Sequence, residues 1–266
     1  MKIAIIGVGN LGLSIAKGIL NSKGTTSLYL TKRNLDEIRE YDAHDIVSLT
    51  TDNREAVKNS DILILAVQPS QLEDLLNGFK DLLTEDHVII STITGYSIEN
   101  MEEILGSNHH IIRSMPNTAI SVGQSMTCIC SNKKGEAKLE LAKSIFNQMG
   151  HSMVIPENQM QAATVICASG IAFWMRLIRA TTQGAIQLGF DAKEAQELAM
   201  HTCSGAANLL IESSSHPEEE IDKVTTPKGC TIQGLNEMEH QGLSSSLIQG
   251  IVASYNKISR IKENQL

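Results

Sequence analysis

The chain has 266 residues, of which 42% are hydrophobic and 20% charged, and its formal net charge at pH 7 is −8. This composition is that of a globular protein long enough for two modest domains, and it excludes a largely disordered chain. The negative net charge and the absence of any Lys/Arg-rich run mean that the sequence lacks the basic surface by which proteins bind nucleic acid.

The first half of the sequence alternates short apolar runs with amphipathic segments, which is the pattern of strands and crossover helices in a parallel sheet. The run at residues 61–67 (DILILAV) is continuously apolar, as is typical of a central strand covered on both faces. We expect strands at residues 2–6, 27–30, 62–67, 87–92, 111–113, 125–130 and 152–155. The sequence therefore predicts an α/β fold with a doubly wound sheet.

After Pro156 the strand pattern ends and helical periodicity continues to the C-terminus. We expect helices at residues 157–188, 191–212, 217–224, 231–240 and 243–260. Asp191 and Pro217 occupy helix-start positions, and Gly189 and Gly242 occupy helix-stop positions. We therefore place a domain boundary after residue 156, with an α/β domain at 1–156 and an all-helical domain at 157–266.

One uncharged stretch, residues 158–175, approaches the length of a membrane span. Its Asn158, Gln159 and Gln161 make it too polar for lipid, so we expect a buried helix. The first apolar run is too short for the core of a signal peptide, and we expect a cytoplasmic protein. Small and apolar residues cover most of the circumference of the helix at 157–188, which predicts at least a homodimer.

Neither cysteines nor histidines have the spacing of a metal site. The five cysteines form no CxxC pair, and we interpret them as reduced thiols that mainly fill the core; they are Cys128, Cys130, Cys167, Cys203 and Cys230. His109 and His110 lie outside any HExxH pattern. We therefore expect no metal and no disulfide framework.

A glycine-rich loop, G-V-G-N-L-G at residues 7–12, follows the first strand and opens a helix. Gly7 permits a tight turn, Gly9 admits a pyrophosphate, and Gly12 allows close packing of helix and strand. The helix N-terminus offers free N–H groups to phosphates. The loop therefore predicts a dinucleotide site that includes Val8, Asn10 and Leu11 with the three glycines.

The end of the second strand indicates which dinucleotide is bound. NAD-specific sites place an acidic residue there, but this chain has Thr31, Lys32 and Arg33. Two cations and a hydroxyl suit a ribose 2′-phosphate, and the Arg33 fork can make a bidentate contact. We expect NADPH, with NADH used more weakly. The alternative is that Lys32 and Arg33 are solvated loop charges.

Five segments, taken in order, resemble the pyrroline-5-carboxylate reductase family. They are G-V-G-N at 7–10, A-V-Q-P at 66–69, R-S-M-P-N-T at 113–118, A-S-G-I-A-F at 168–173 and T-T-P-K-G-C-T-I at 225–232. The last resembles the family's T-S-P-G-G-T-T-I and is the most diagnostic. The resemblance covers nearly the whole chain and implies a Rossmann-type doubly wound sheet followed by an all-helical dimerisation domain.

The resemblance also implies an activity and a set of site residues. The activity is NADPH-dependent hydride transfer to a cyclic imine, giving L-proline in the last step of proline biosynthesis. Further cofactor contacts are implied at Asn53, Ala66, Val67, Gln68, Pro69, Thr94, Gly95 and Asn117, and substrate contacts at Glu157, Gly229, Cys230 and Thr231. We expect a homo-oligomer that binds this small molecule and neither nucleic acid nor membrane.

The resemblance assigns catalysis to the hydroxyl of Thr231, as hydrogen-bond partner of the imine nitrogen. Backbone N–H groups of residues 229–231 would hold the substrate carboxylate at a helix start. An alternative role for Thr231 is that of an ordinary helix N-cap. The chain departs from the family pattern at Gln68, Thr94, Ala119, Ile171, Phe173 and Lys228, which affects fine specificity.

Two other functions stay open. A hydroxyacid dehydrogenase-like reductase also joins a Rossmann domain to helices, but many such enzymes use a Lys in the interdomain helix, and residues 157–189 contain none. A non-catalytic NADP-binding regulatory homologue would retain the fold without the activity, because fold does not imply function. The substitutions at Gln68, Ile171 and Lys228 suggest this second alternative.

Overall fold

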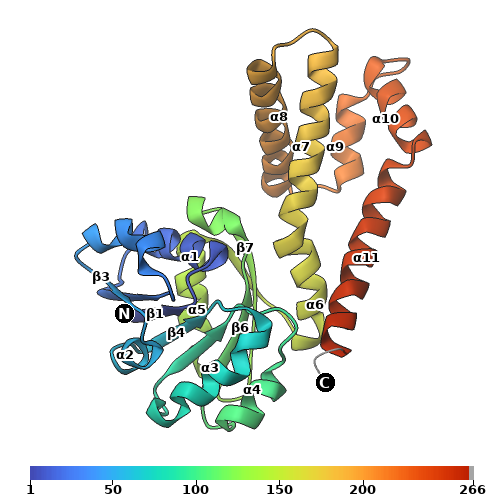
Figure 1. Cartoon of the computed structure of the whole chain (residues 1–266). Coiled ribbons are helices and arrows are strands. Elements are labelled where there is room, and N and C mark those ends of the chain that lie inside the picture. Colours follow the sequence, from blue (N-terminus) through green and yellow to red (C-terminus); the bar gives the residue numbers. More distant parts are fainter. Residues whose placement is uncertain (264–266) are drawn as a thin grey trace. The chain divides into compact units, whose positions relative to one another are not determined.

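A computed structural model describes residues 1–263 and divides the chain into two compact units (Figure 1). One unit comprises Met1–Ser169 together with the C-terminal residues from Tyr255, and the other comprises Gly170–Ser254. Residues 157–169, expected in the helical domain, belong to the first unit because Met160 and Ala163 are buried in a core cluster of the sheet. The boundary after residue 156 stays a prediction.

The first unit is built on an eight-stranded sheet in the order β3-β2-β1-β4-β5-β6-β7-β8. Its chain order reverses between β1 and β4, which is the topological switch point of a doubly wound fold. The strands are β1 (Lys2–Ile6), β2 (Ser27–Thr31), β3 (Val47–Thr50), β4 (Ile62–Leu65), β5 (Val88–Ser91), β6 (His110–Met115), β7 (Ser125–Ser131) and β8 (Gly150–Val154). The predicted α/β class and doubly wound sheet are confirmed.

Two features of the sheet differ from the sequence-based expectation. Strand β3 (Val47–Thr50) was not predicted, because it has only two apolar residues, each followed by a polar one, whereas the equally short β4 is apolar throughout. Strand β7 runs antiparallel to β6, whereas the other neighbours pair in parallel. A parallel connection needs a crossover of a dozen or more residues, and the loop from β6 to β7 holds only the short 3-10 helix η4 (Thr118–Val122).

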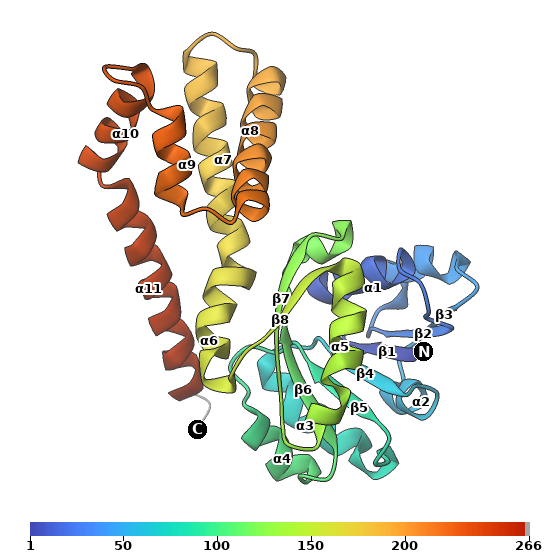
Figure 2. The ribbon, with the colours of Figure 1, turned by 180° about the vertical axis from the view of Figure 1, so that it is seen from behind.

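Helices cover both faces of the sheet, because successive residues of each strand face opposite sides. Ile3 and Ile5 of β1 pack with helices α1 (Asn10–Leu20) and α5 (Leu139–Phe146). Ala4 and Ile6 pack on the other face with α2 (Asn53–Lys58), α3 (Leu72–Phe79) and α4 (Ile98–Leu105). Figure 2 shows α5 on the face opposite to α3 and α4.

Short helices complete the first unit. The 3-10 helices are η1 (Leu35–Ala43), η2 (Pro69–Gln71), η3 (Lys80–Leu82), η5 (Gly135–Lys138), η6 (Asn147–Met149) and η7 (Glu157–Gln159). They are followed by α6 (Met160–Ala163) and the π-helix η8 (Thr164–Ser169). The predicted continuous helix from residue 157 is therefore interrupted before Gly170 by a 3-10 turn and a π turn.

The second unit is helical, as predicted. Its helices are α7 (Gly170–Gln187), α8 (Ala192–Ser213), α9 (Pro217–Val224), α10 (Cys230–His240) and the first part of α11 (Leu243–Glu263). The Asp191 side chain caps α8 by accepting from the N–H groups of Lys193 and Glu194 at 2.8 and 3.1 Å. Gly189 and Gly242 take positive φ angles of 106° and 83°. The predicted starts and stops are confirmed.

The second unit exposes large apolar side chains. Trp174, Leu188 and Ile211 are 58%, 84% and 70% exposed. Helical residues Glu157–Gln187 are also long and apolar enough to cross a membrane by length and composition, and only 17% of their most apolar window is buried. Of residues 158–175, expected to form a buried helix, Met160, Ala163 and Val165 are buried, whereas Trp174 and Met175 are exposed within the residues described. The expectation therefore holds only for the part that packs against the sheet.

Candidate cofactor cleft and substrate loop

A cleft of about 650 Å³ lies at the ends of β1, β2 and β4, beside the switch point of the sheet. Ligands of open α/β sheets bind at this position, because loops on either side of the reversal point diverge there. Ten of the predicted cofactor residues line the cleft: Gly7, Val8, Gly9, Thr31, Lys32, Arg33, Asn53, Ala66, Val67 and Gln68. The sequence motifs are therefore brought together in one cavity.

The glycine loop fits the phosphates of a dinucleotide. Gly7 has a φ of +90°, and a Cβ there would collide with Val67. A Cβ on Gly12 would lie 2.8 Å from the carbonyl oxygen of Gly7, whereas one on Gly9 would meet nothing within 4 Å. Gly9 is also the N-cap of α1 and cannot supply a side-chain cap, so the N–H groups of the first turn, at Asn10, Leu11 and Gly12, are left for an anion.

Thr31 supports this loop from the neighbouring strand. Its hydroxyl is buried and accepts a hydrogen bond from the Gly7 N–H at 3.2 Å, while its carbonyl accepts from the Val8 N–H at 2.9 Å. We expected the hydroxyl to suit a ribose phosphate. The hydroxyl accepts from the glycine loop but keeps its own O–H to donate, and Thr31 lines the cleft, so its contact with a ribose phosphate stays a prediction.

The two cations of the cleft differ in their surroundings. Lys32 Nζ lies 2.8 Å from a carboxylate oxygen of Glu37, and its side chain is only 20% exposed. The hydrogen bond and charge of Lys32 hold the pKa of Glu37 below its usual range. Arg33 is exposed and forms no ion pair within residues 1–263. Arg33 is therefore the cation left unneutralised for a phosphate.

Four predicted cofactor residues outside the glycine loop do not line this cleft. Pro69 begins η2, and Thr94 and Gly95 lie in the loop after β5. Asn117 is buried, and its side chain accepts from the Ala119 N–H at 2.9 Å and donates to the Cys167 carbonyl at 3.0 Å. Asn117 thus caps η4 and connects it to the π-helix η8. The cofactor roles of these four residues stay predictions.

Six further residues line the cleft and were missed from the sequence: Asn34, Glu37, Thr51, Gln71, Asp74 and Leu75. Thr51 follows β3, so recognising that strand would have placed it at the same edge of the sheet as Thr31. Asn34 carries a recognisable signal, because it caps η1 by accepting from the Asp36 N–H at 3.1 Å. Gln71 and Asp74 belong to the turn and helix that follow Pro69.

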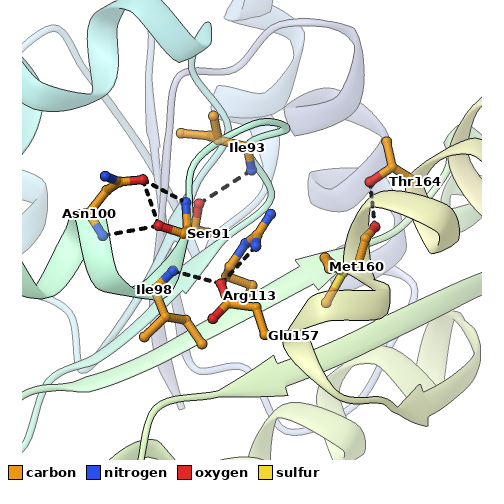
Figure 3. Close-up of polar contacts among 9 residues, drawn as sticks. Ser91, Ile93, Ile98, Asn100, Arg113, Glu157, Met160 and Thr164 are labelled. Carbon is orange, nitrogen blue, oxygen red and sulfur yellow. Dashed lines mark hydrogen bonds and ion pairs between the residues drawn. The ribbon is translucent and has the colours of Figure 1, made fainter. Parts of the chain in front are cut away.

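Glu157, predicted to border the substrate, is an anchor within the first unit (Figure 3). One of its carboxylate oxygens accepts from the Ile98 N–H at 2.7 Å and from Nη1 of Arg113 at 2.8 Å. Arg113 is 4% exposed, and its Nε has no partner. Glu157 therefore holds the start of α4 to the end of the sheet, and its substrate role stays a prediction.

The predicted substrate loop begins α10 in the second unit. Gly229 is the N-cap, its N–H donates to the Thr226 carbonyl at 2.9 Å, and Cys230 is exposed. Thr231 is the second helical residue, and its hydroxyl makes no hydrogen bond within residues 1–263. The alternative role of Thr231 as the N-cap is therefore wrong. Glycine caps this helix without a side chain, which leaves first-turn N–H groups for an anion.

Comparison with known proteins places both units in one family. Residues 157–261 match the family described as pyrroline-5-carboxylate reductase dimerisation, and residues 2–95 match the family described as NADP oxidoreductase, coenzyme F420-dependent. Pyrroline-5-carboxylate reductase 2 of Dictyostelium discoideum is 43% identical over 97% of this chain and 92% of its own length. The chain belongs to the pyrroline-5-carboxylate reductase family.

Other members of this family agree. Pyrroline-5-carboxylate reductase 1 of Dictyostelium discoideum is 47% identical over 97% of this chain, which spans about half (49%) of that relative. The crystal structure of the Plasmodium falciparum pyrroline carboxylate reductase with NADP bound has a TM-score of 0.89 and 25% identity, covering 98% of each chain. The fold and the dimerisation domain expected for a pyrroline-5-carboxylate reductase are therefore confirmed.

Proposed function

We propose that this chain is an NADPH-dependent pyrroline-5-carboxylate reductase that makes L-proline. In this reaction the cyclic C=N bond gains a hydride at carbon and a proton at nitrogen, and NADPH leaves as NADP⁺. Family membership supplies the reaction. The observation that supports it in this molecule is the cleft at the switch point, where Gly9 leaves open space and Arg33 is an unneutralised cation.

The first unit would bind the dinucleotide. The N-terminus of α1 at Asn10 would face the pyrophosphate, because its first-turn N–H groups lack intrahelical acceptors. Arg33 would hold the 2′-phosphate through its planar fork, with Lys32 beside it. The bound cofactor supplies the hydride. NADH, which lacks that phosphate, would bind more weakly.

The second unit would bind the imine. The N–H groups at Cys230 and Thr231 open α10 and would hold the substrate carboxylate, whereas the Gly229 N–H already donates to the Thr226 carbonyl. The Thr231 hydroxyl, which has no hydrogen-bond partner within residues 1–263, would hydrogen-bond the ring nitrogen. A cyclic imine is more basic than a carbonyl and can arrive protonated, so this position needs no strong acid.

We also propose that the protein is a cytoplasmic homodimer or higher homo-oligomer that binds neither nucleic acid nor membrane. The match of residues 157–261 to a dimerisation family coincides with the exposed apolar side chains of the second unit, Trp174 and Leu188 among them. A second copy of the chain would cover these side chains. Burial between two copies would also explain why residues 157–187 are as apolar as a membrane-spanning helix, with no need for a lipid environment.

The proposed function is tested by following NADPH oxidation with pyrroline-5-carboxylate and the purified full chain. Turnover with this imine, and no NADP⁺ reduction with a panel of 2- and 3-hydroxy acids, would support it. Oxidation of hydroxy acids alone would favour the hydroxyacid dehydrogenase alternative. Tight NADPH binding by calorimetry with no turnover of either substrate class would favour the regulatory homologue.

A further inference from the structure

Two thiols lie in contact inside the first unit. Sγ of Cys128, on β7, is 3.8 Å from Sγ of Cys167, in the π-helix η8. Cys128 is 4% exposed, whereas Cys167 is half-buried. Both residues belong to the same compact unit, so their proximity does not depend on how the two units are arranged. Cys128 is thus buried, and Cys167 is the partly exposed residue of the pair.

The contact shifts the pKa values of the two thiols in opposite directions. Hydrogen bonding from Cys128 lowers the pKa of Cys167 to about 7, and the same contact raises the pKa of Cys128 above its ordinary value. The two thiols in contact titrate as a coupled pair. Cys130, on the same strand, differs, because burial raises its pKa to about 11. A thiolate at neutral pH is the nucleophilic form of cysteine.

The two sulfurs lie close to bonding distance in an irregular helical turn. A disulfide has an S–S length of about 2.05 Å, so bonding requires a shift of under 2 Å from the present contact. Cys167 lies in a π turn, where the helix register is already irregular, and π turns concentrate at functional positions. Asn117 holds the Cys167 carbonyl at 3.0 Å, which keeps the segment against β7.

We propose that Cys128 and Cys167 form a reversible thiol-oxidation site that peroxides convert to an intramolecular disulfide. The Cys167 thiolate attacks one peroxide oxygen, the O–O bond breaks, and Cys167 becomes a sulfenic acid as hydroxide leaves. Cys128 then attacks the Cys167 sulfur, and a second hydroxide leaves as the S–S bond forms. The thiols lose two electrons, and their two protons convert both hydroxides to water. A dithiol reductant reverses the reaction by exchange.

The proposal is independent of the enzymatic activity and is tested on the full-length protein. The folded protein is treated with hydrogen peroxide, its remaining thiols are alkylated, and its peptides are mapped by mass. We expect a peptide pair joined through Cys128 and Cys167, lighter by two hydrogen atoms, that dithiothreitol separates. Oxidation of Cys203 or Cys230 while Cys128 and Cys167 stay alkylatable would overturn the proposal. This map needs no variant, so it is informative even if substitutions impair folding.

Two variants sharpen the result. Cys130→Ala is the matched control, because Cys130 lies on the same strand and is equally buried, at 3% exposure. It should leave the linked peptide unchanged. Cys128→Ala should abolish the linked peptide. Because it also removes the hydrogen bond that lowers the pKa of Cys167, the Cys167 sulfenic acid that dimedone traps should form more slowly than the disulfide forms in the parent protein. Loss of the linked peptide in Cys130→Ala but not in Cys128→Ala would contradict the assignment.

Discussion

Lys32 Nζ and the Glu37 carboxylate lie 2.8 Å apart in the lining of the cleft. Of the two cations that line the cleft, Lys32 and Arg33, the first is therefore already neutralised. Arg33 lacks such a partner within residues 1–263. The preference for a phosphorylated cofactor should therefore depend more on Arg33 than on Lys32. This asymmetry leads to two predictions about cofactor affinity.

Arg33→Ala should raise the KM for NADPH by roughly ten- to a hundred-fold, since hydrogen bonds to charged groups contribute about 1.5–3 kcal/mol. The KM for NADH should change little, because NADH has no 2′-phosphate. Initial rates with both cofactors at fixed imine concentration measure this. Equal effects on the two cofactors would show that Arg33 does not read the phosphate. Arg39→Ala, in an exposed pair with Asp36, is the control.

Glu37→Gln should lower the KM for NADPH, because it releases Lys32 and removes a negative charge beside the phosphate. Lys32 depresses the pKa of Glu37, so the carboxylate is lost only when the pH falls through that lowered value. The effect of the substitution should therefore be constant between about pH 6 and 8. A KM that rises instead would indicate that Glu37 itself contacts the cofactor.

Lys228→Gly should stabilise the protein by about 1 kcal/mol. Lys228 has a φ of 60°, in the left-handed region that residues with a Cβ enter at a cost and glycine enters freely. Urea unfolding monitored by circular dichroism measures the change. Lys228→Ala retains the strain and should give no gain, which separates backbone strain from the loss of the lysine charge.

Thr231→Ala should lower kcat/KM for the imine by roughly ten- to a thousand-fold, the value of one positioned hydrogen bond in a transition state. Because Gly229 caps α10, the substitution should leave the melting temperature nearly unchanged. Thr231→Ser keeps the hydroxyl and should retain activity. An Ala variant with full activity would remove Thr231 from the mechanism.

Glu157→Gln should destabilise the protein by about 1–3 kcal/mol, below the 3–5 kcal/mol of a fully buried pair, because Glu157 is 34% exposed. The Arg113 guanidinium would remain buried without its counter-charge. Glu140→Gln, which breaks the exposed pair with Lys143, is the control and should cost under about 1 kcal/mol. Equal losses in the two variants would show that burial of Arg113 is not important.

The sequence predicted the cofactor cleft well, because its residues follow strands that carry clear signals. Gly7, Thr31 and Ala66 each end a run that is continuously apolar or nearly so, and parallel strands bring such ends to one edge. Thr51 was missed because β3 alternates apolar and polar residues over only four positions and lacks the continuous apolar run of β4. The direction of β7 was equally hidden, since hydrophobic pattern does not distinguish parallel from antiparallel pairing.

Side-chain partners were harder to predict than positions. The sequence placed Thr31, Asn117 and Glu157 near a site, but their hydrogen bonds go to Gly7, Cys167 and Ile98 within the fold. Such contacts join residues 24 to 59 positions apart, and no local pattern specifies them. The packing of the segment at 157–169 against the sheet could not be predicted for the same reason, because a helical period does not specify which surface a helix packs on.

The support of Gly7 by Thr31 limits how this protein could be redesigned to use NADH. The usual strategy places an acidic residue at the end of the second strand to bind the ribose hydroxyls. At position 31 a carboxylate would have to be buried and would displace the hydroxyl that holds the glycine loop. Substitutions that change the cofactor specificity should therefore be made at Lys32, Arg33 and Asn34, which border the cleft. They should not be made at Thr31, the last residue of the strand.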